Sequence, residues 1–224
     1  MQKIFRRTVV FLISMIIMSM SASLSTKASL GVSPISSVPY TLSLIPDSFS
    51  FGMWTFIFNF ALVLGGIAIM RRNYKPFYAL CVIFVIVFSY LCDVFLIVFD
   101  GVHPDNYILQ WGIEIISILL LAFGIALSIA SSLSMLPGDF FVRFLSAVKE
   151  WNFGHTKIAF DFTCIVASIV ISLLFLPEIS GIREGTIAFI ITVGPLVDFF
   201  VNIIRRTGLM YWVGYEPIEI RKNQ

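Results

Sequence analysis

Charged residues are scarce in this chain. Only 12% of the 224 residues are Asp, Glu, Lys or Arg, whereas 58% are hydrophobic and the mean hydropathy is +0.96. A soluble domain of this length carries about 25% charged residues. Because so few polar residues do not cover the surface of a folded domain in water, the composition excludes an ordinary soluble domain. It indicates an integral membrane protein whose main partner is the lipid bilayer.

The sequence also lacks the short motifs of common enzymes and metal sites. It contains no HExxH, no CxxC and no GxSxG, and the wider signature of aspartyl intramembrane proteases is missing around Pro137-Gly138-Asp139. No basic stripe is interleaved with aromatic residues, which excludes nucleic acid as a partner. We therefore predict no enzymatic activity, no cofactor and no metal site. The cysteines lie inside apolar runs, which is typical of packing residues: Cys81, Cys92 and Cys164.

Long apolar runs are what the chain has in place of these motifs. A membrane-spanning helix needs about 20 mostly apolar residues. Six runs meet this length, and they cover roughly 8–28, 52–70, 77–99, 107–131, 156–176 and 185–204. The first run has the outline of a signal peptide, but the repeat described below matches it to an internal helix. We therefore expect an all-α polytopic membrane protein with six transmembrane helices.

Basic residues predict the orientation of these helices. If the N-terminus is cytoplasmic and the spans alternate, the outer side receives only Lys27 and Arg183. Lys and Arg accumulate on the cytoplasmic side of membrane proteins. We therefore predict that both termini, including a tail over 207–224, are cytoplasmic. The basic residues on that side are Lys3, Arg6, Arg7, Arg71, Arg72, Lys75, Arg143, Lys149, Lys157, Arg205, Arg206, Arg221 and Lys222.

The two halves of the chain resemble each other. Three sets of anchors occur in the same order in both, and six residues separate Gly52 from Asn59 just as six separate Gly154 from Asp161. The aligned anchors are Ser29–Pro34 with Ser132–Pro137, Phe51–Phe60 with Phe153–Phe162, and Asp93 with Asp198.

This self-similarity predicts two repeats of three helices, over 1–105 and 106–206. Because each repeat has an odd number of spans, the second enters the membrane from the opposite side. The halves are then related by a pseudo-two-fold axis in the membrane plane, as in many secondary transporters.

Two proline-containing links follow Ser-rich helix ends, one at Gly31–Pro39 and the other at Ser131–Asp139. Proline lacks a backbone donor, and irregular backbone is tolerated in a membrane only where protein or water satisfies it. The links are therefore either ordinary loops at the interface or re-entrant segments that line a cavity.

Carboxylates inside spans are the other candidate functional groups. They usually face the bundle interior or water, since burial in hydrocarbon costs several kcal/mol. The i,i+4 spacing of Lys157 and Asp161 allows an ion pair, and we expect it to be structural and to reach the surface. Asp93 and Asp198 either form helix–helix hydrogen bonds or bind a proton or cation.

Three further features of the sequence are less specific indicators. Gly194-Pro195, one turn before Asp198, predicts a helix break in the middle of its span. Glu114 lies two turns into its span, where we expect a near-surface position. His155 is expected at the membrane interface, with a proton relay as the alternative.

Several of these features resemble a known family. Gly31-Val32-Ser33-Pro34 after a Ser/Ala-rich first helix, Phe51-Gly52, and Gly194-Pro195 with Asp198 are similar to the YczE/YyaS/YitT group of bacterial membrane proteins. The second half departs from it at Leu136–Asp139. The resemblance implies a multi-spanning protein of the bacterial cytoplasmic membrane, and it implies no substrate and no catalytic residues.

The leading hypothesis is a secondary transporter that binds a small solute or ion near the midplane between the repeats. The alternative is a non-transporting scaffold or accessory subunit of another membrane complex, and either form allows a homo-oligomer or a membrane partner. In the transporter, Asp93 or Asp198 would couple protons. The predicted substrate-binding residues are Ser33, Pro34, Ser36, Asn59, Pro137, Asp139, Asp161 and Asp198.

Overall fold

The computed structural model describes residues 2–70, 79–131 and 137–213, and all regular secondary structure in these ranges is helical. Six helices are long and apolar enough to cross a membrane, which confirms the predicted spans. With 20 residues, the shorter of them rise about 30 Å, the thickness of the hydrocarbon core. These six are α1 (Gln2–Ala28), α3 (Phe51–Met70), α4 (Ala79–Val98), α5 (Tyr107–Ser131), α7 (Phe153–Phe175) and α8 (Glu184–Arg206).

Several residues used in the sequence analysis lie outside the described part of the chain. They are Arg71, Arg72 and Lys75, the anchors Ser132–Leu136, and Arg221 and Lys222 in the tail, together with the side chain of Arg143.

Three shorter helices complete the described structure: α2 (Pro34–Ser43), α6 (Pro137–Lys149) and α9 (Leu209–Val213). Pro34 and Pro137 are the first residues of α2 and α6, where the fixed φ of proline suits a helix and its missing N–H costs nothing. Both helices pack between α3 and α7 inside the bundle. From the two prolines onward, the links are therefore buried helices, and the alternative of an ordinary interfacial loop is wrong there.

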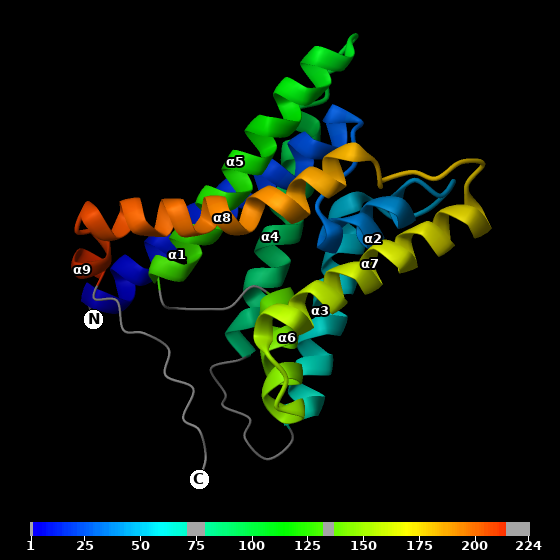
Figure 1. Ribbon diagram of the computed structural model, residues 1–224. Helices are drawn as coiled ribbons and strands as arrows, with labels where there is room; N and C mark the ends of the chain where they lie inside the picture. The colour runs from blue at the N-terminus through cyan, green and yellow to red at the C-terminus, as the bar shows by residue number, and fades with distance from the viewer. Residues whose placement is uncertain (1, 71–78, 132–136, 214–224) are drawn as a thin grey trace.

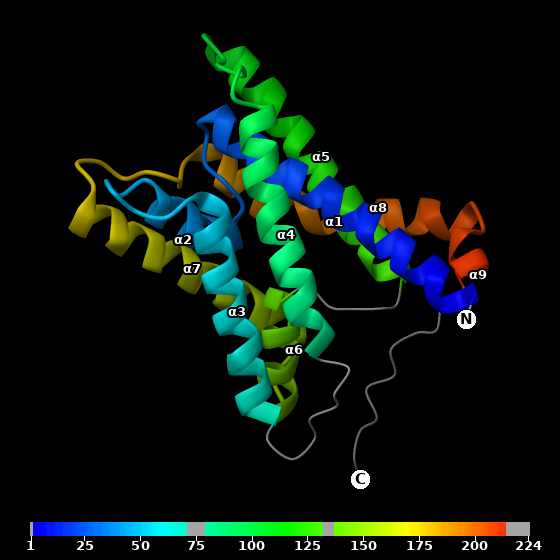
Figure 2. The ribbon, with the colours of Figure 1, turned by 180° about the vertical axis from the view of Figure 1, so that it is seen from behind.

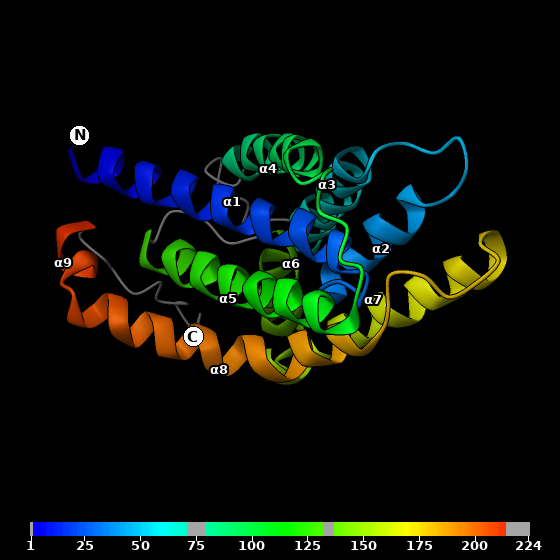
Figure 3. The same ribbon diagram turned by 90° about the horizontal axis from the view of Figure 1, so that it is seen from above.

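The helices form two groups that diverge from a common region (Figure 1). The α1 group contains α1, α5, α8 and α9, and the α3 group contains α2, α3, α6 and α7. Helix α4 packs against both groups, because it contacts α1 and α3. Seen from behind in Figure 2, α4 bridges them. Helix α8 instead packs along α5 and runs away from α7, as the view from above shows (Figure 3).

The antiparallel pair α1 and α5 forms the largest helix contact. Ser21 Oγ donates a hydrogen bond of 2.6 Å to the Ser117 carbonyl, and Gly124 lies directly over Met18 and within 3.3 Å of the Ser14 carbonyl, measured from an added Cβ. Lipid tails give helices no hydrophobic reason to associate, so small residues and hydrogen bonds of this kind hold them together. The small residues of both helices therefore set how closely α1 and α5 approach.

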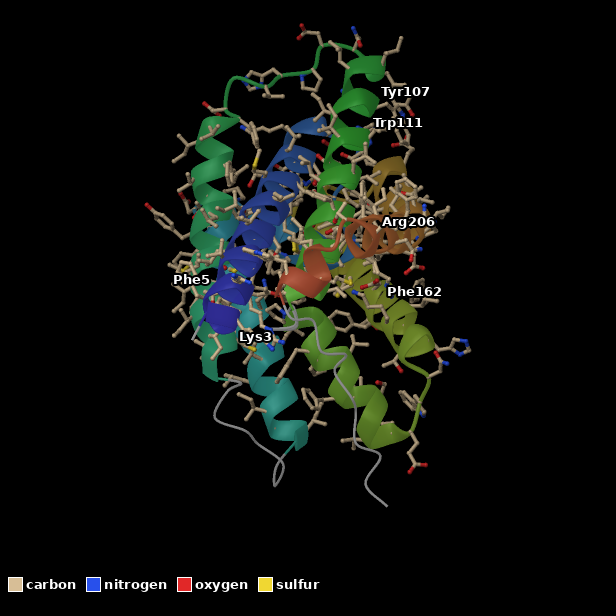
Figure 4. The ribbon with its side chains drawn as sticks, turned by 90° about the vertical axis from the view of Figure 1, so that its left-hand side faces the viewer. Lys3, Phe5, Tyr107, Trp111, Phe162 and Arg206 are labelled. Atoms are coloured by element: carbon tan, nitrogen blue, oxygen red, sulfur yellow. The ribbon has the colours of Figure 1, made fainter. Side chains whose placement is uncertain are left out.

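Large apolar side chains cover the outside of the bundle. Phe5 is 71% exposed and points outward in Figure 4, and Leu173 on α7 is 67% exposed. Single exposed apolar side chains are normal on soluble proteins. An apolar surface all round the bundle, on helices long enough to span a membrane, is instead suited to the hydrocarbon core of a bilayer. The protein is therefore a multi-pass membrane protein in contact with the bilayer.

The C-terminal helix α9 is attached to the start of α1. The Arg6 guanidinium lies 4.5 Å from the centre of the Trp212 ring and donates to the Trp212 carbonyl at 3.2 Å. Arg7 Nε donates to the Val213 carbonyl at 3.4 Å. These contacts place the start of α1 and the end of α8 at the same end of the molecule, where Lys3 and Arg206 are labelled in Figure 4.

We predict that Gly124→Leu lowers the thermal stability of the protein in detergent micelles, because the side chain would separate α1 from α5. Overpacking of this kind costs about 1–3 kcal/mol. Gly112→Leu on the same helix is the matched control, since an added Cβ there meets nothing within 4 Å. Equal melting temperatures of the two variants, followed by circular dichroism, would contradict the described α1–α5 contact.

Candidate functional site

A cavity of about 790 Å³ lies between the two helix groups. Its walls come from each of the helices α1 to α8. Side chains from both halves of the chain thus meet around one space. The apolar part of its wall is formed by Phe11, Met15, Met18, Phe84, Val85, Phe88, Leu121, Ile125, Ile158, Phe162, Ile165, Phe189, Ile190, Val193 and Val197.

The cavity also has polar residues, and most were predicted from the sequence. Ser33, Pro34 and Ser36 come from the start of α2, and Pro137 comes from the start of α6. Asn59, Asp161 and Asp198 come from α3, α7 and α8. The structure thus brings seven of the eight predicted substrate-binding residues to one cavity. The side chain of the eighth, Asp139, lies outside the described part of the chain.

Both proline helices begin at the cavity. The first turn of α2 presents Ser33, Pro34 and Ser36, and the Ser33 hydroxyl donates to the Ser36 hydroxyl at 3.0 Å. The first turn of α6 presents Pro137 and Gly138. First-turn N–H groups carry partial positive charge. The polar part of the cavity therefore combines hydroxyl groups with the positive ends of two helix dipoles.

Lys157 and Asp161 form the predicted ion pair, with 2.9 Å between Nζ and Oδ1. Both line the cavity, and their side chains are 29% and 23% exposed. The pair thus lies on the cavity wall near the start of α7, and both side chains are partly exposed. Because the two charges compensate each other, this part of the wall is polar but nearly neutral.

Asp93 is not part of the cavity wall. Its carboxylate accepts hydrogen bonds from the Gly52 amide at 2.7 Å and from the Ser50 hydroxyl at 2.6 Å. An added Cβ at Gly52 would overlap Asp93 and the Ser89 carbonyl, so glycine lets α4 lie directly on the start of α3. We call these bonds the Asp93 contact. They confirm the alternative of a helix–helix hydrogen bond for this residue.

Asp198, which the sequence aligns with Asp93, has a different environment. It is exposed on the cavity wall, and no hydrogen bond or ion pair joins it to any residue in 2–70, 79–131 or 137–213. Gly154, which aligns with Gly52, lines the same cavity. Its amide donates to Asn152 Oδ1 at 2.9 Å, so α7 is capped by its own preceding residue.

The second half also lacks the close helix approach that Gly52 permits in the first. An added Cβ at Gly154 would meet only Asn152 Oδ1, at 3.3 Å, and one at Gly194 would meet nothing within 4 Å. No neighbouring helix therefore explains why residues 154 and 194 are glycine in this conformation.

One sequence expectation near the site is wrong. Helix α8 continues through Pro195 without a break, because a membrane helix tolerates the one hydrogen bond that proline removes. Glu114 lies two turns into α5, as expected, but α1 and α8 cover it. It is 0% exposed, and neither carboxylate oxygen has a hydrogen-bond partner among the described residues.

Sequence reasoning also missed the contribution of α1 to the cavity. Ser21 and Ser25 line it, and Ser14 lies on the same helix face at a spacing of seven residues from Ser21. Serines that recur every four or seven residues in an apolar helix mark a face turned toward protein. That periodicity was the available signal.

Comparison with known proteins assigns the family. The chain belongs to a family of unknown function, DUF6198, whose model matches residues 5–202. This match does not confirm the resemblance to the YczE/YyaS/YitT group, and nothing in it conflicts with that resemblance. No curated protein and no solved structure matches the chain.

We predict that the polar part of the cavity is open to water. In a variant without Cys81, Cys92 and Cys164, Ser36→Cys should react with a membrane-impermeant thiol reagent in reconstituted vesicles. Ile83→Cys should not react, because Ile83 is 55% exposed on the apolar surface of α4 and faces lipid. Labelling is measured as a mass increase. A Ser36→Cys variant as unreactive as Ile83→Cys would contradict an aqueous cavity.

Proposed function

Because the chain belongs to a family of unknown function, we propose its activity from its geometry: it is a secondary transporter of a small amphipathic solute. The two halves are inverted repeats, and the solute binds in the cavity between them. The main support for this proposal is a difference between the last helices of the two halves. Helix α4 packs on α3 through the Asp93 contact, whereas α8, the equivalent helix of the second half, is separated from α7.

Equivalent contacts across the α1–α5 pair support the inverted repeat. At the register that aligns Pro34 with Pro137, Ser21 aligns with Gly124 and Ser117 with Ser14. Ser21 lies on the Ser117 carbonyl, and Gly124 lies on the Ser14 carbonyl. Each contact is thus the counterpart of the other, as a pseudo-two-fold axis between antiparallel helices requires.

The short helices give a second, independent pair of equivalent contacts. In the first, the Ser168 hydroxyl of α7 donates to the Ser37 carbonyl of α2 at 3.2 Å. In the second, Gly66 of α3 lies against the Phe140 ring of α6. When Pro34 is aligned with Pro137, Ser37 aligns with Phe140, and when Asn59 is aligned with Asp161, Gly66 aligns with Ser168. The two contacts therefore join equivalent positions in the two halves. The same symmetry therefore relates α2 with α7 to α6 with α3.

Because the rest of the two halves follows the proposed symmetry, we interpret the different packing of α4 and α8 as one state of a transport cycle. Two halves of similar structure have two packings of similar energy. In one packing α4 is closed on α3, and in the other α8 is closed on α7; we call α4 and α8 the gate helices. The present structure has α4 closed and α8 open. In the other state, Asp198 would accept the Gly154 amide that Asn152 now holds, and Asp93 would release Gly52.

The distribution of basic residues orients the proposed cycle. With the N-terminus in the cytoplasm of a bacterium, the start of α7 and the end of α8 are cytoplasmic, and both carry cavity residues, namely Gly154 and Asp198. The Asp93 contact lies at the outer ends of α3 and α4. The structure is then the inward-facing state, closed outside and open inside.

The cavity wall favours a particular class of solute. Most of the wall is aromatic or aliphatic, and fewer polar groups are set into it, at the starts of α2, α6 and α7 and on α1, α3 and α8. Such a pocket suits a molecule with an apolar body and one polar group. A volume of about 790 Å³ lies within the range of pockets that hold drug-sized ligands.

The alternative of a non-transporting scaffold is less well supported. A scaffold needs a lipid-facing or partner-facing surface, and it has no use for an internal cavity lined by both proline helices. Pro34 and Pro137 both line the cavity.

We predict that Gly154→Val folds like the wild type but transports poorly. In the present state an added Cβ meets only the side chain of Asn152, at 3.3 Å, and no neighbouring helix, whereas the closed α7–α8 state would be overpacked by about 1–3 kcal/mol. At a tenfold change for each ~1.4 kcal/mol, transport falls roughly 5- to 150-fold. Uptake into proteoliposomes of a panel of aromatic amines, aromatic acids and short fatty acids is measured by mass spectrometry.

Gly112→Val is the matched control for this assay and should transport at the wild-type rate. If no panel compound enters wild-type vesicles faster than protein-free vesicles, the transport proposal is wrong for this class of solute. If the wild type transports and Gly154→Val does so equally fast, the solute moves without closure of α8 on α7.

A further inference from the structure

Glu114 is set apart from every other charged residue whose burial the structure describes. It is the only Asp, Glu, Lys or Arg among them that is fully buried, with 0% of its surface exposed. It does not line the cavity, where Lys157, Asp161 and Asp198 lie. Both of its oxygens are enclosed and have no hydrogen-bond partner among the described residues. A buried carboxyl without a partner needs an explanation.

The first turn of α8 is shaped to cover this carboxyl. An added Cβ at Gly185 would overlap Glu114 Oε1, so only glycine lets α8 lie on it. The Gly185 amide does not serve the carboxyl, because it donates to the Leu30 carbonyl at 2.8 Å. Ser117, one turn further along α5, also has a buried hydroxyl without a partner. Together these features form an enclosed polar site.

Among the described residues, no cation forms an ion pair or hydrogen bond with Glu114, and Arg205 and Arg206 of α8 lie in its last turn, far along the helix from Gly185. On α8, Arg183 donates to the Ser29 carbonyl at 2.9 Å and lies 3.5 Å from Glu184. On α1, Lys27 is paired with Asp100 at 3.0 Å. Helix α5 carries no other charged residue, and α9 carries none. Arg6 and Arg7 are bound to α9 at the opposite end of α1.

We propose that Glu114 is a proton-binding site, occupied in this conformation. An ionised carboxylate without donor or counter-ion is very unfavourable in a buried site, so the group carries a proton here. A metal ion fits the surroundings poorly. Hard cations need several oxygen ligands, and the described residues contain no cluster of three or more His, Cys, Asp or Glu.

The geometry connects this proton to the cavity, and this step rests on the proposed function. Helix α8 covers Glu114 with Gly185 and lines the cavity one turn later with Phe189. Ser21 lines the cavity and donates to the carbonyl of Ser117, the residue three positions after Glu114 on α5. Release of the proton requires water at the carboxylate, and therefore a displacement of the first turn of α8. The proton on Glu114 is thereby coupled to the position of the gate helix.

Infrared difference spectroscopy of the full-length protein in lipid tests the site directly. Wild type at neutral pH should show the carbonyl-stretch band of a protonated carboxylic acid, shifted by exchange into heavy water. Glu114→Gln should lack this band, and Asp198→Asn should keep it. The Gln variant is uncharged and nearly the same size, so it should fold, as checked by its melting temperature.

Two results would overturn the proton site. One is a wild-type spectrum at neutral pH without the band, identical to that of Glu114→Gln. The other is a band that appears only when sodium is replaced by choline, because a bound cation would then be the native occupant.

A transport assay distinguishes failure of this inference from failure of the proposed function. If the wild type transports, Glu114→Gln should remove the dependence of uptake on a pH gradient, and unchanged dependence would contradict the coupling. If no variant transports but the band behaves as expected, the proton site stands and the transporter proposal fails.

Discussion

The close antiparallel crossing of α1 and α5 is the contact on which the rest of the structure depends. Within the bilayer there is no hydrophobic gain from bringing two helices together, so approach is possible only where side chains are small and polar groups find partners. Ser14 and Ser21 on α1, with Ser117 and Gly124 on α5, meet these conditions in two equivalent places. The crossing holds together the two halves of the chain, and every other helix is positioned by packing on this pair or on its neighbours.

A molecule built this way from two similar halves has a choice that a single-copy fold lacks. In the proposed inverted repeat, the crossing and the short helices obey one symmetry, whereas α4 and α8 break it. Glycine at position 52 is explained by the close contact of α4, but glycine at position 154 has no such explanation in this conformation. If the two halves alternate between two packings, each glycine is in close helix contact in one state and without such a contact in the other. Under the proposed function, the cavity, helices α4 and α8, and buried Glu114 belong to one transport cycle.

Much of the fold was predictable because the bilayer imposes simple rules. Hydropathy located all six spans, and the alignment of Pro34 with Pro137 and of Asn59 with Asp161 identified residues that line one cavity. Other features were not predictable. Burial of Glu114 depends on where α8 begins, and hydropathy carries no information on this. The different environments of Asp93 and Asp198 were not predictable either, because the two residues align in the sequence but only α4 packs against its partner helix.

The central claim is that closure of α4 on α3 and closure of α8 on α7 exclude each other. Spin labels in a cysteine-free background at Phe49 and Asp100 report on the outer ends, and labels at Trp151 and Thr207 report on the inner ends. Pulsed dipolar spectroscopy in lipid should give two distances for each pair, and changes in pH or added solute should shift the two populations in opposite directions. A single unchanging distance for both pairs, or distances that shorten together, would contradict the account.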